Sequence, residues 1–291
     1  MGTVVLLALT GLGLGALYFL IASGLSLVFG LADVLNFAHG LFLSVGAYAT
    51  WWAGGRLSGP WGFPVAVLFG VACGAAVGGL VELVLIRPLY RRPTEQVLVT
   101  VGLSLAGVAL LQAGWGADPR RYPSPQWTQK VTRVLGADVP NDRLLLIGVA
   151  VVVLAGLLAF LRFTRYGLVI RAGVENRAMV SALGIDVRRA FTLVFAIGGA
   201  LAGLAGALGG VYFGSVSPGQ GASLLIFAFI VVVIGGMGSV TGSAYAAVAV
   251  GLLQQFVNYY GTAGAGDICV VALLAVVLLV RPAGIAGRAA T

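Results

Sequence analysis

The chain is built from long apolar runs separated by short segments that hold its charges. Crossing a hydrocarbon core about 30 Å thick takes about 20 residues of helix. Backbone polar groups in that core must be satisfied within the protein, which favours helices. We therefore predict an all-α, polytopic transmembrane helical bundle, a single domain over residues 1–291, with about eight or nine membrane segments. The expected runs are 3–29, 35–53, 64–86, 96–115, 144–161, 190–213, 221–236, 242–258 and 264–280.

Composition excludes several classes of protein. Hydrophobic residues make up 60% of the chain and charged residues 9%, against about 25% charged in soluble domains. No soluble catalytic domain fits between the spans. The net charge is +8, but the basic residues lie in the loops between spans. This placement indicates membrane orientation rather than nucleic-acid binding.

The sequence carries almost no catalytic chemistry. It has one histidine and one lysine, Lys130, so it holds neither a Walker lysine motif nor the spacing of a zinc site. Cys73 and Cys269 lie within apolar runs, which supports neither a disulfide nor a metal site. We expect no catalytic residue, metal or cofactor on this chain. The first run starts at Thr3 with no basic residue ahead of it, which argues against a cleaved signal peptide.

One long polar island, residues 162–190, interrupts the second half of the chain. It carries six arginines against Glu175 and Asp186. If this island is cytoplasmic, alternation of the spans places eleven of the 17 basic residues on the same side. The bias predicts an N-terminus outside and a C-terminus inside. Segment 116–143, rich in proline and polar residues, then becomes an external loop that is able to meet an extracytoplasmic partner.

The centre of the island has the pattern of a short helix between two spans. Val174, Ala178, Ala182 and Ile185 form a narrow face of small and apolar residues. Gly184 suits a helix C-terminus, so the helix is expected to stop there. Such a helix can dock into a groove on a soluble partner, although charged loops are common in any polytopic protein. The candidate coupling residues are Glu175, Asn176, Ala178, Ala182, Gly184 and Asp186.

A short segment near the C-terminal third is broken by glycines. Residues 223–234 give a dozen continuous apolar residues, about 18 Å of helix, after a Ser217-Pro218 cap and first turn. The segment and its neighbour either cross as two short spans or form a re-entrant pair. Irregular backbone at membrane depth needs protein or a water-filled path beside it. The candidate path residues here are Gly235, Gly236, Gly238 and Ser239.

A second polar stretch lies between the first two spans. Asn36 and His39 are three residues apart, followed by Gly40, where a helix is just starting. Buried polar side chains in a membrane need partners or water. These residues are candidates for a gate or a solute path. The alternative is that His39 is a hydrogen-bonded packing residue.

Glycine is frequent, with 45 residues, and many glycines are spaced four apart, as at 70, 74 and 78. Small residues let helices approach closely in lipid, so tight packing is the expected role. Faces that slide during transport are the alternative.

Four segments resemble the LivH-type permeases of branched-chain amino acid importers. Asn-Phe-Ala-His-Gly at 36–40 is the closest local match. Residues 175–186 resemble the coupling loop of ABC importer permeases, although they depart from its strict Glu-Ala-Ala form. Gly-Gly-Met-Gly-Ser at 235–239 and Arg-Pro-Ala-Gly-Ile at 281–285 extend the resemblance over nearly the whole chain.

The resemblance implies a multi-pass permease subunit of the bacterial inner membrane. Its implied partners are a second, LivM-type permease in a heterodimer, two cytoplasmic ABC ATPase subunits that bind ATP and Mg²⁺, and a periplasmic solute-binding protein. Branched-chain amino acids are the expected solute, with urea or short amides as the alternative, and a homodimer of permeases stays open.

An ion-driven carrier and a passive channel are the rival classes. Carriers usually need buried carboxylates, and the sequence offers two. Glu82 lies near the end of its span, within reach of Arg87, and Asp267 is expected to cap the last helix. A channel would leave the candidate coupling helix without a role.

Overall fold

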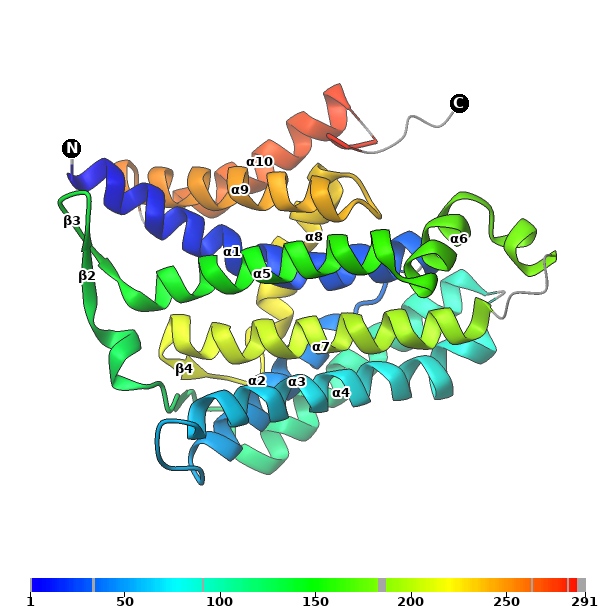
Figure 1. Cartoon of the computed structure of the whole chain (residues 1–291), viewed down its shortest axis with the longest axis horizontal. Helices are drawn as coiled ribbons and strands as arrows, with labels where there is room; N and C mark the ends of the chain where they lie inside the picture. The colour runs from blue at the N-terminus through cyan, green and yellow to red at the C-terminus, as the bar shows by residue number, and fades with distance from the viewer. Residues whose placement is uncertain are drawn as a thin grey trace.

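The computed structural model describes residues 2–32, 35–90, 92–182, 187–262, 264–281 and 283–286, with backbone alone at 32, 174–178, 181–182 and 187. Within this part there are ten α-helices. The helices α1, α4, α5, α7 and α9 run along the long axis of the molecule, and α8 lies across it (Figure 1). The all-α polytopic bundle predicted from the sequence is confirmed. The helices are α1 (Gly2–Ala32), α2 (His39–Gly54), α3 (Gly62–Val81), α4 (Pro93–Trp115), α5 (Asn141–Phe163), α6 (Arg165–Ala182), α7 (Val187–Phe213), α8 (Gln220–Gly235), α9 (Val240–Tyr260) and α10 (Ala265–Val280).

Six described helices are long and apolar enough to cross a bilayer, so the protein is an integral membrane protein. They are α1, α4, α5, α7, α9 and the helix that starts with α3 and continues through the π-helix η1 (Glu82–Ile86) and the 3₁₀-helix η2 (Arg87–Leu89). The helices α2, α8 and α10 have 16 residues each, which gives about 24 Å. These three fall short of a full crossing on their own.

The core forms around α1 and α7. In the most apolar 18-residue stretch of each spanning helix, 61% of the residues are buried for α1 and 67% for α7, but only 17% for α4 and for α5. The first two helices therefore lie inside the bundle, and α4 and α5 lie at its periphery. On α1 the buried run includes Leu17, Leu20, Ile21 and Leu25. This helix packs against α5, α7, α8 and α9.

Close backbone contacts join α2, α3 and α7. A Cβ built on Gly203 of α7 would lie 2.7 Å from the carbonyl oxygen of Gly70 on α3, and Gly46 of α2 lies against the other side of Gly203. A Cβ built on Gly78 of α3 would lie 2.5 Å from the carbonyl oxygen of Phe195 on α7. These spacings explain the glycines four residues apart as packing surfaces.

The end of the bundle that holds the start of α1 is closed by short β segments (Figure 1). The strand β1 (Arg120–Arg121) pairs with β4 (Ser215–Val216), which attaches the loop after α4 to the chain after α7. After the 3₁₀-helix η3 (Gln126–Gln129), β2 (Val131–Val134) and β3 (Ala137–Pro140) form a hairpin. A Cβ on Gly2 would lie 3.0 Å from the Gly136 carbonyl oxygen, so the hairpin turn packs against the start of α1.

A chain of hydrogen bonds joins α1, α9 and α10. The Tyr18 hydroxyl donates to Gln254 Oε1 at 2.8 Å, and Gln254 Nε2 donates to Asp267 Oδ1 at 2.5 Å. The expected cap at Asp267 was wrong: the N-cap is Gly264, and the Gly266 N–H in the first turn donates to Asn258 Oδ1 of α9 at 2.9 Å. Asp267 lies in the first turn, where a carboxylate still suits the helix dipole.

The close contact at Gly203 predicts that no side chain larger than that of glycine fits at this position without moving the helices. Replacing Gly203 by Ala should force α3 and α7 apart, because the new Cβ would overlap the Gly70 carbonyl. Overpacking costs about 1–3 kcal/mol, so the Tm of the purified protein should fall by about 2 °C or more.

Gly102 of α4 is the matched control, since a Cβ there has no neighbour within 4 Å. Gly102→Ala should leave the Tm unchanged or raise it, because alanine favours helix more than glycine does. Equal Tm values for the two variants would show that the α3–α7 contact is loose.

Candidate functional site

The α2 helix begins in the middle of the bundle. His39, its first residue, lies against α1, where Nε2 donates a hydrogen bond to the Ile21 carbonyl oxygen at 3.2 Å. Ile21 is about 16 Å from the end of α1 at 1.5 Å per residue. The chain after α1 therefore turns back along that helix before α2 starts. This depth explains why α2 has only 16 residues.

Asn36 and His39 are both fully buried at this break. Asn36 Oδ1 accepts a hydrogen bond from the Ala38 backbone N–H at 3.0 Å. Asn36 Nδ2 and His39 Nδ1 have no hydrogen-bond partner among the described residues. Leaving a buried polar atom unpaired is costly. His39 therefore has a packing role through its hydrogen bond to Ile21, while Asn36 Nδ2 and His39 Nδ1 are still able to form hydrogen bonds.

The α8 helix also begins at this depth. A Cβ on Gly40 of α2 would lie 2.8 Å from the Gly221 carbonyl oxygen, and the Ser44 hydroxyl donates to the Pro218 carbonyl oxygen at 3.2 Å. The two short helices then run in opposite directions, with α8 lying across the middle of the bundle in Figure 1. The sequence showed the break before α2, but it did not predict that α8 starts beside it.

The start of α8 differs from the sequence prediction. Ser217 and Pro218 precede the helix, whose N-cap is Gly219 without a side-chain cap. Residues Gly219, Ala222 and Ser223 are exposed. Exposed irregular backbone at membrane depth is stable only beside protein or water. This face of α8 is therefore covered by another subunit or lines a water-filled path.

The glycine turn after α8 is covered by the chain after α10. Gly236 and Gly238 have φ values of 97° and 85°, which glycine adopts without strain. The Ser239 hydroxyl accepts from the Gly242 N–H at 3.0 Å and caps α9. The Ile285 N–H donates to the Ile234 carbonyl oxygen at 2.8 Å, and the Ala286 N–H donates to that of Gly235 at 3.1 Å. The turn is thus held on one side by protein.

The last turn of α1 brings these segments together. A Cβ on Gly30 would lie 3.1 Å from Gly238 Cα in the glycine turn, and one on Gly173 of α6 would lie 2.7 Å from a methyl group of Leu31. The helix in the polar island therefore touches α1 just before the break that leads to His39. The glycine turn touches the same end.

The polar island forms the helix α6, which is longer than the short helix expected. It starts one residue after α5, because the Thr164 hydroxyl accepts the Gly167 N–H at 2.9 Å. Glu175, Asn176, Ala178 and Ala182 all lie within α6, and nothing is described of their side chains. Gly184 and Asp186 lie outside the described residues. Their coupling roles stay predictions.

Two exposed apolar side chains mark one face of α6. Leu168 is 62% exposed and Met179 is 63% exposed. They are eleven residues apart, which is three helical turns, so both point the same way. Exposed apolar side chains on a surface helix are suited to contact with a protein partner.

The two carboxylates that a carrier would need are both paired. Glu82 is fully buried, and its carboxylate receives hydrogen bonds from Arg87 Nε at 3.4 Å and the Thr192 hydroxyl at 2.6 Å. Asp267 accepts from Gln254. Among the described residues, no group of three His, Cys, Asp or Glu side chains could hold a metal ion.

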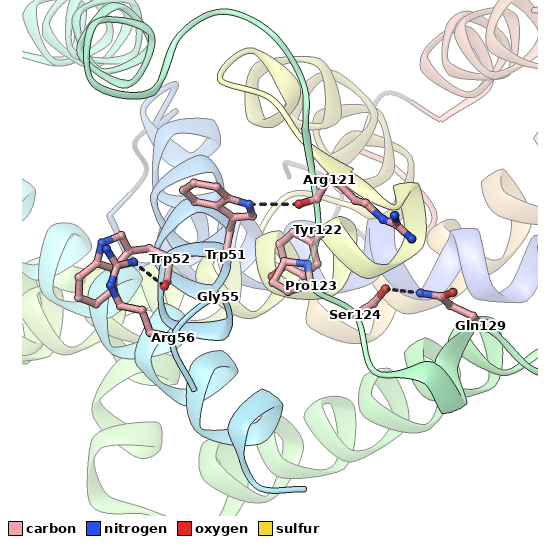
Figure 2. Close-up of a pocket in the computed structure, with 9 residues that line it drawn as sticks. All are labelled: Trp51, Trp52, Gly55, Arg56, Arg121, Tyr122, Pro123, Ser124 and Gln129. Carbon is pink, nitrogen blue, oxygen red and sulfur yellow. Dashed lines mark hydrogen bonds between the residues drawn. The ribbon is translucent and has the colours of Figure 1, made fainter. Parts of the chain in front are cut away.

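A pocket of about 690 Å³ opens at the end that carries the β segments (Figure 2). Trp51 Nε1 donates to the Arg121 carbonyl oxygen at 3.1 Å, and the Arg56 guanidinium stacks 4.0 Å from the Trp52 ring centre. The predicted external loop supplies five of the nine lining residues. The lining residues are Trp51, Trp52, Gly55, Arg56, Arg121, Tyr122, Pro123, Ser124 and Gln129.

Helices that begin at membrane mid-depth, beside one another, are a feature of membrane transport proteins. Residues 7–280 match the model of the family described as "Branched-chain amino acid transport system / permease component". The chain belongs to this family, which confirms the resemblance seen in the sequence. It is a transport permease subunit.

The similarity to individual relatives extends over nearly the whole chain. The chain is 30% identical to the high-affinity branched-chain amino acid transport system permease protein LivH of Escherichia coli (strain K12), covering 96% of this chain and 94% of the relative. The same figures hold for BraD of Pseudomonas aeruginosa. The probable LivH of Methanocaldococcus jannaschii is 26% identical over 92% of this chain and 88% of its own. No solved structure matches the chain significantly.

The exposed start of α8 predicts water access. After Cys73 and Cys269 are replaced by serine, Ser223→Cys should react with a charged methanethiosulfonate reagent. Val152→Cys should not, although Val152 is 71% exposed at the middle of α5, because lipid excludes the reagent. Labelling is read by mass shift in membranes that hold the assembled transporter.

Cysteines at 36 and 39 test the break in the same assay. Both positions are fully buried in this conformation, so they should react only in another state of the transport cycle. No reaction at 36, 39 and 223, with and without ATP, would contradict a path along these residues.

Proposed function

We propose that this chain is the membrane-spanning subunit of an ATP-driven importer of branched-chain amino acids. Family membership over residues 7–280 supports a permease, and relatives named for branched-chain amino acid transport support the solute. The structural observation that carries the mechanism concerns the surface helix α6. This helix has exposed apolar side chains, and its Gly173 contacts the end of α1 at Leu31.

The proposed partners are those that membership of this family implies, each assigned to a surface of this chain. Two cytoplasmic ATPase subunits would bind α6 and supply the energy with ATP and Mg²⁺. A related, LivM-type permease would form a heterodimer and enclose, with this chain, a water-filled path beside the exposed start of α8. A periplasmic solute-binding protein would deliver the solute at the end with the β segments, where the aromatic and arginine pocket opens.

The orientation in the bacterial inner membrane follows from the arginines. With α6 in the cytoplasm, the N-terminus lies outside and the C-terminus inside. The start of α1 and the β2–β3 hairpin lie together at the end of the bundle opposite to α6 (Figure 1), which agrees with this assignment.

The proposed mechanism moves rigid helices. ATP-driven closure of the ATPases displaces α6, which presses on Leu31 at the end of α1. The displacement shifts the break at Asn36 and His39 and the glycine turn at 236–238, both of which join that end. A path beside the start of α8 then opens to one side at a time.

An ion-coupled carrier is less well supported. Glu82 is tied to Arg87, and Asp267 is tied to Gln254. A carboxylate that already has such partners is a poor carrier of protons across the membrane.

Changes on α6 should separate ATP hydrolysis from transport. Leu168→Asp and Met179→Asp each place a charge on the exposed apolar face, and each should weaken ATPase binding about tenfold or more. Ala178→Arg with Ala182→Arg, or Gly184→Val, should uncouple ATPase activity from uptake. The measurements are co-purification of the ATPases and solute-stimulated ATPase and uptake in proteoliposomes.

Retention of the second permease in the same purification is the control for folding. Variants that keep this subunit and show normal solute-stimulated ATPase and uptake would remove α6 from the coupling role.

A further inference from the structure

The π-helix η1 places a buried carboxylate in the middle of a polar cluster. Glu82 is fully buried and accepts from three side chains: the Tyr90 hydroxyl, Arg87 and the Thr192 hydroxyl. The Arg87 Nη2 also donates to Thr192 Oγ1 at 2.8 Å. The Thr192 hydroxyl thus accepts from the arginine and donates to the carboxylate. π-Helical turns are rare and are frequent at functional sites.

The cluster joins two parts of the chain that lie far apart in sequence. Glu82, Arg87 and Tyr90 belong to the connection between α3 and α4, whereas Thr192 lies near the start of α7. The Tyr90 ring also packs on Phe191, with ring centres 4.8 Å apart. Thr192 is five residues into α7, the helix that follows α6 in the chain, so this tie lies close to the α6 segment in sequence.

Packing makes α3 follow α7. The two helices touch through backbone at Gly70 and Gly203, and at Gly78 and Phe195, without side chains that could slide or flex. A displacement of the start of α7 is therefore transmitted to α3 as a rigid body. The Glu82 cluster holds the end of this contact closed, and it holds the start of α4 as well.

The connection continues to the break before α2. Gln96 Nε2 on α4 donates to the Leu89 carbonyl oxygen at 2.5 Å. Thr100 Oγ1, one turn further on, accepts from the Phe37 N–H at 3.4 Å. Phe37 is the residue after Asn36. Polar contacts, joined by the chain at 89–90 and by one turn of α4, therefore connect α7 through Glu82 to the segment that precedes His39.

We propose that Glu82, Arg87, Tyr90 and Thr192 transmit movement of the α6–α7 segment to α3, α4 and the break before α2. The proposal rests on the proposed function, because the movement comes from the ATPases. Glu82 acts here as a positioning residue and not as a proton carrier. This route is separate from the contact of α6 with Leu31.

The test uses the complete transporter in proteoliposomes, with both permeases, the ATPases and the binding protein. Thr192→Val removes the hydroxyl that crosses between the helices while it keeps the shape of the side chain. It should assemble normally and lower the solute transported per ATP hydrolysed about fivefold or more, the lower range of allosteric coupling. Thr192→Ser restores the hydroxyl and should restore coupling.

Thr10→Val is the matched control, since the Thr10 hydroxyl bonds only to carbonyls of its own helix, at 2.7 and 3.2 Å. It should keep wild-type coupling. Glu82→Gln combined with Thr192→Val should lose no more coupling than the stronger single variant, because both changes break one network.

Two results are decisive. Wild-type transport per ATP in Thr192→Val, or equal loss in Thr192→Val and Thr192→Ser, would overturn the proposal. Absence of ATP-driven uptake by the wild-type complex would instead overturn the proposed function.

Discussion

The need to satisfy backbone polar groups inside a membrane constrains the rest of this structure. Where helices are continuous, the need is met within each helix. It becomes restrictive where α2 and α8 begin at mid-depth beside one another. There the chain uses Asn36, Ser44 and the bond from His39 to Ile21, and still leaves the start of α8 exposed. The exposed backbone requires a second subunit or water, and so connects the fold with transport.

Glycine makes this arrangement possible. Hydrophobic attraction between helices is weak in lipid, so helices associate through close packing. The contacts at Gly203 and Gly40 let helices lie backbone to backbone, and the contact at Gly30 lets the glycine turn at 236–238 lie against α1. Because these contacts are rigid, the displacement of one helix also displaces the helices that pack against it. A movement applied at the start of α7 reaches α3 through backbone contacts, and a movement applied at α6 reaches α1 at the Leu31 side chain.

Much of the fold could be predicted from the sequence, because apolar runs and glycine breaks report directly on membrane helices. The runs at 3–29 and 190–213 became the buried helices α1 and α7. The break at Asn36 and His39 was visible because polar residues interrupt an apolar pattern. The depth in the bundle at which α8 starts could not be predicted, because nothing in the local sequence Ser217-Pro218 shows that this helix starts beside Gly40. The caps also differed, since Gly219 and Gly264 took places expected for residues with side-chain oxygens. The cluster around Glu82 was seen only in part, as a pair with Arg87, because Thr192 is 110 residues away in sequence.

The central claim is that this chain has no energy source of its own and is driven from outside through α6. Transport by the purified chain in proteoliposomes is the most direct measurement, made with an imposed proton or sodium gradient and with leucine as the solute. The account predicts no accumulation under either gradient, and accumulation after the partner permease, the ATPases, the binding protein and ATP are added. Uphill uptake of leucine by the chain alone under an ion gradient would contradict it.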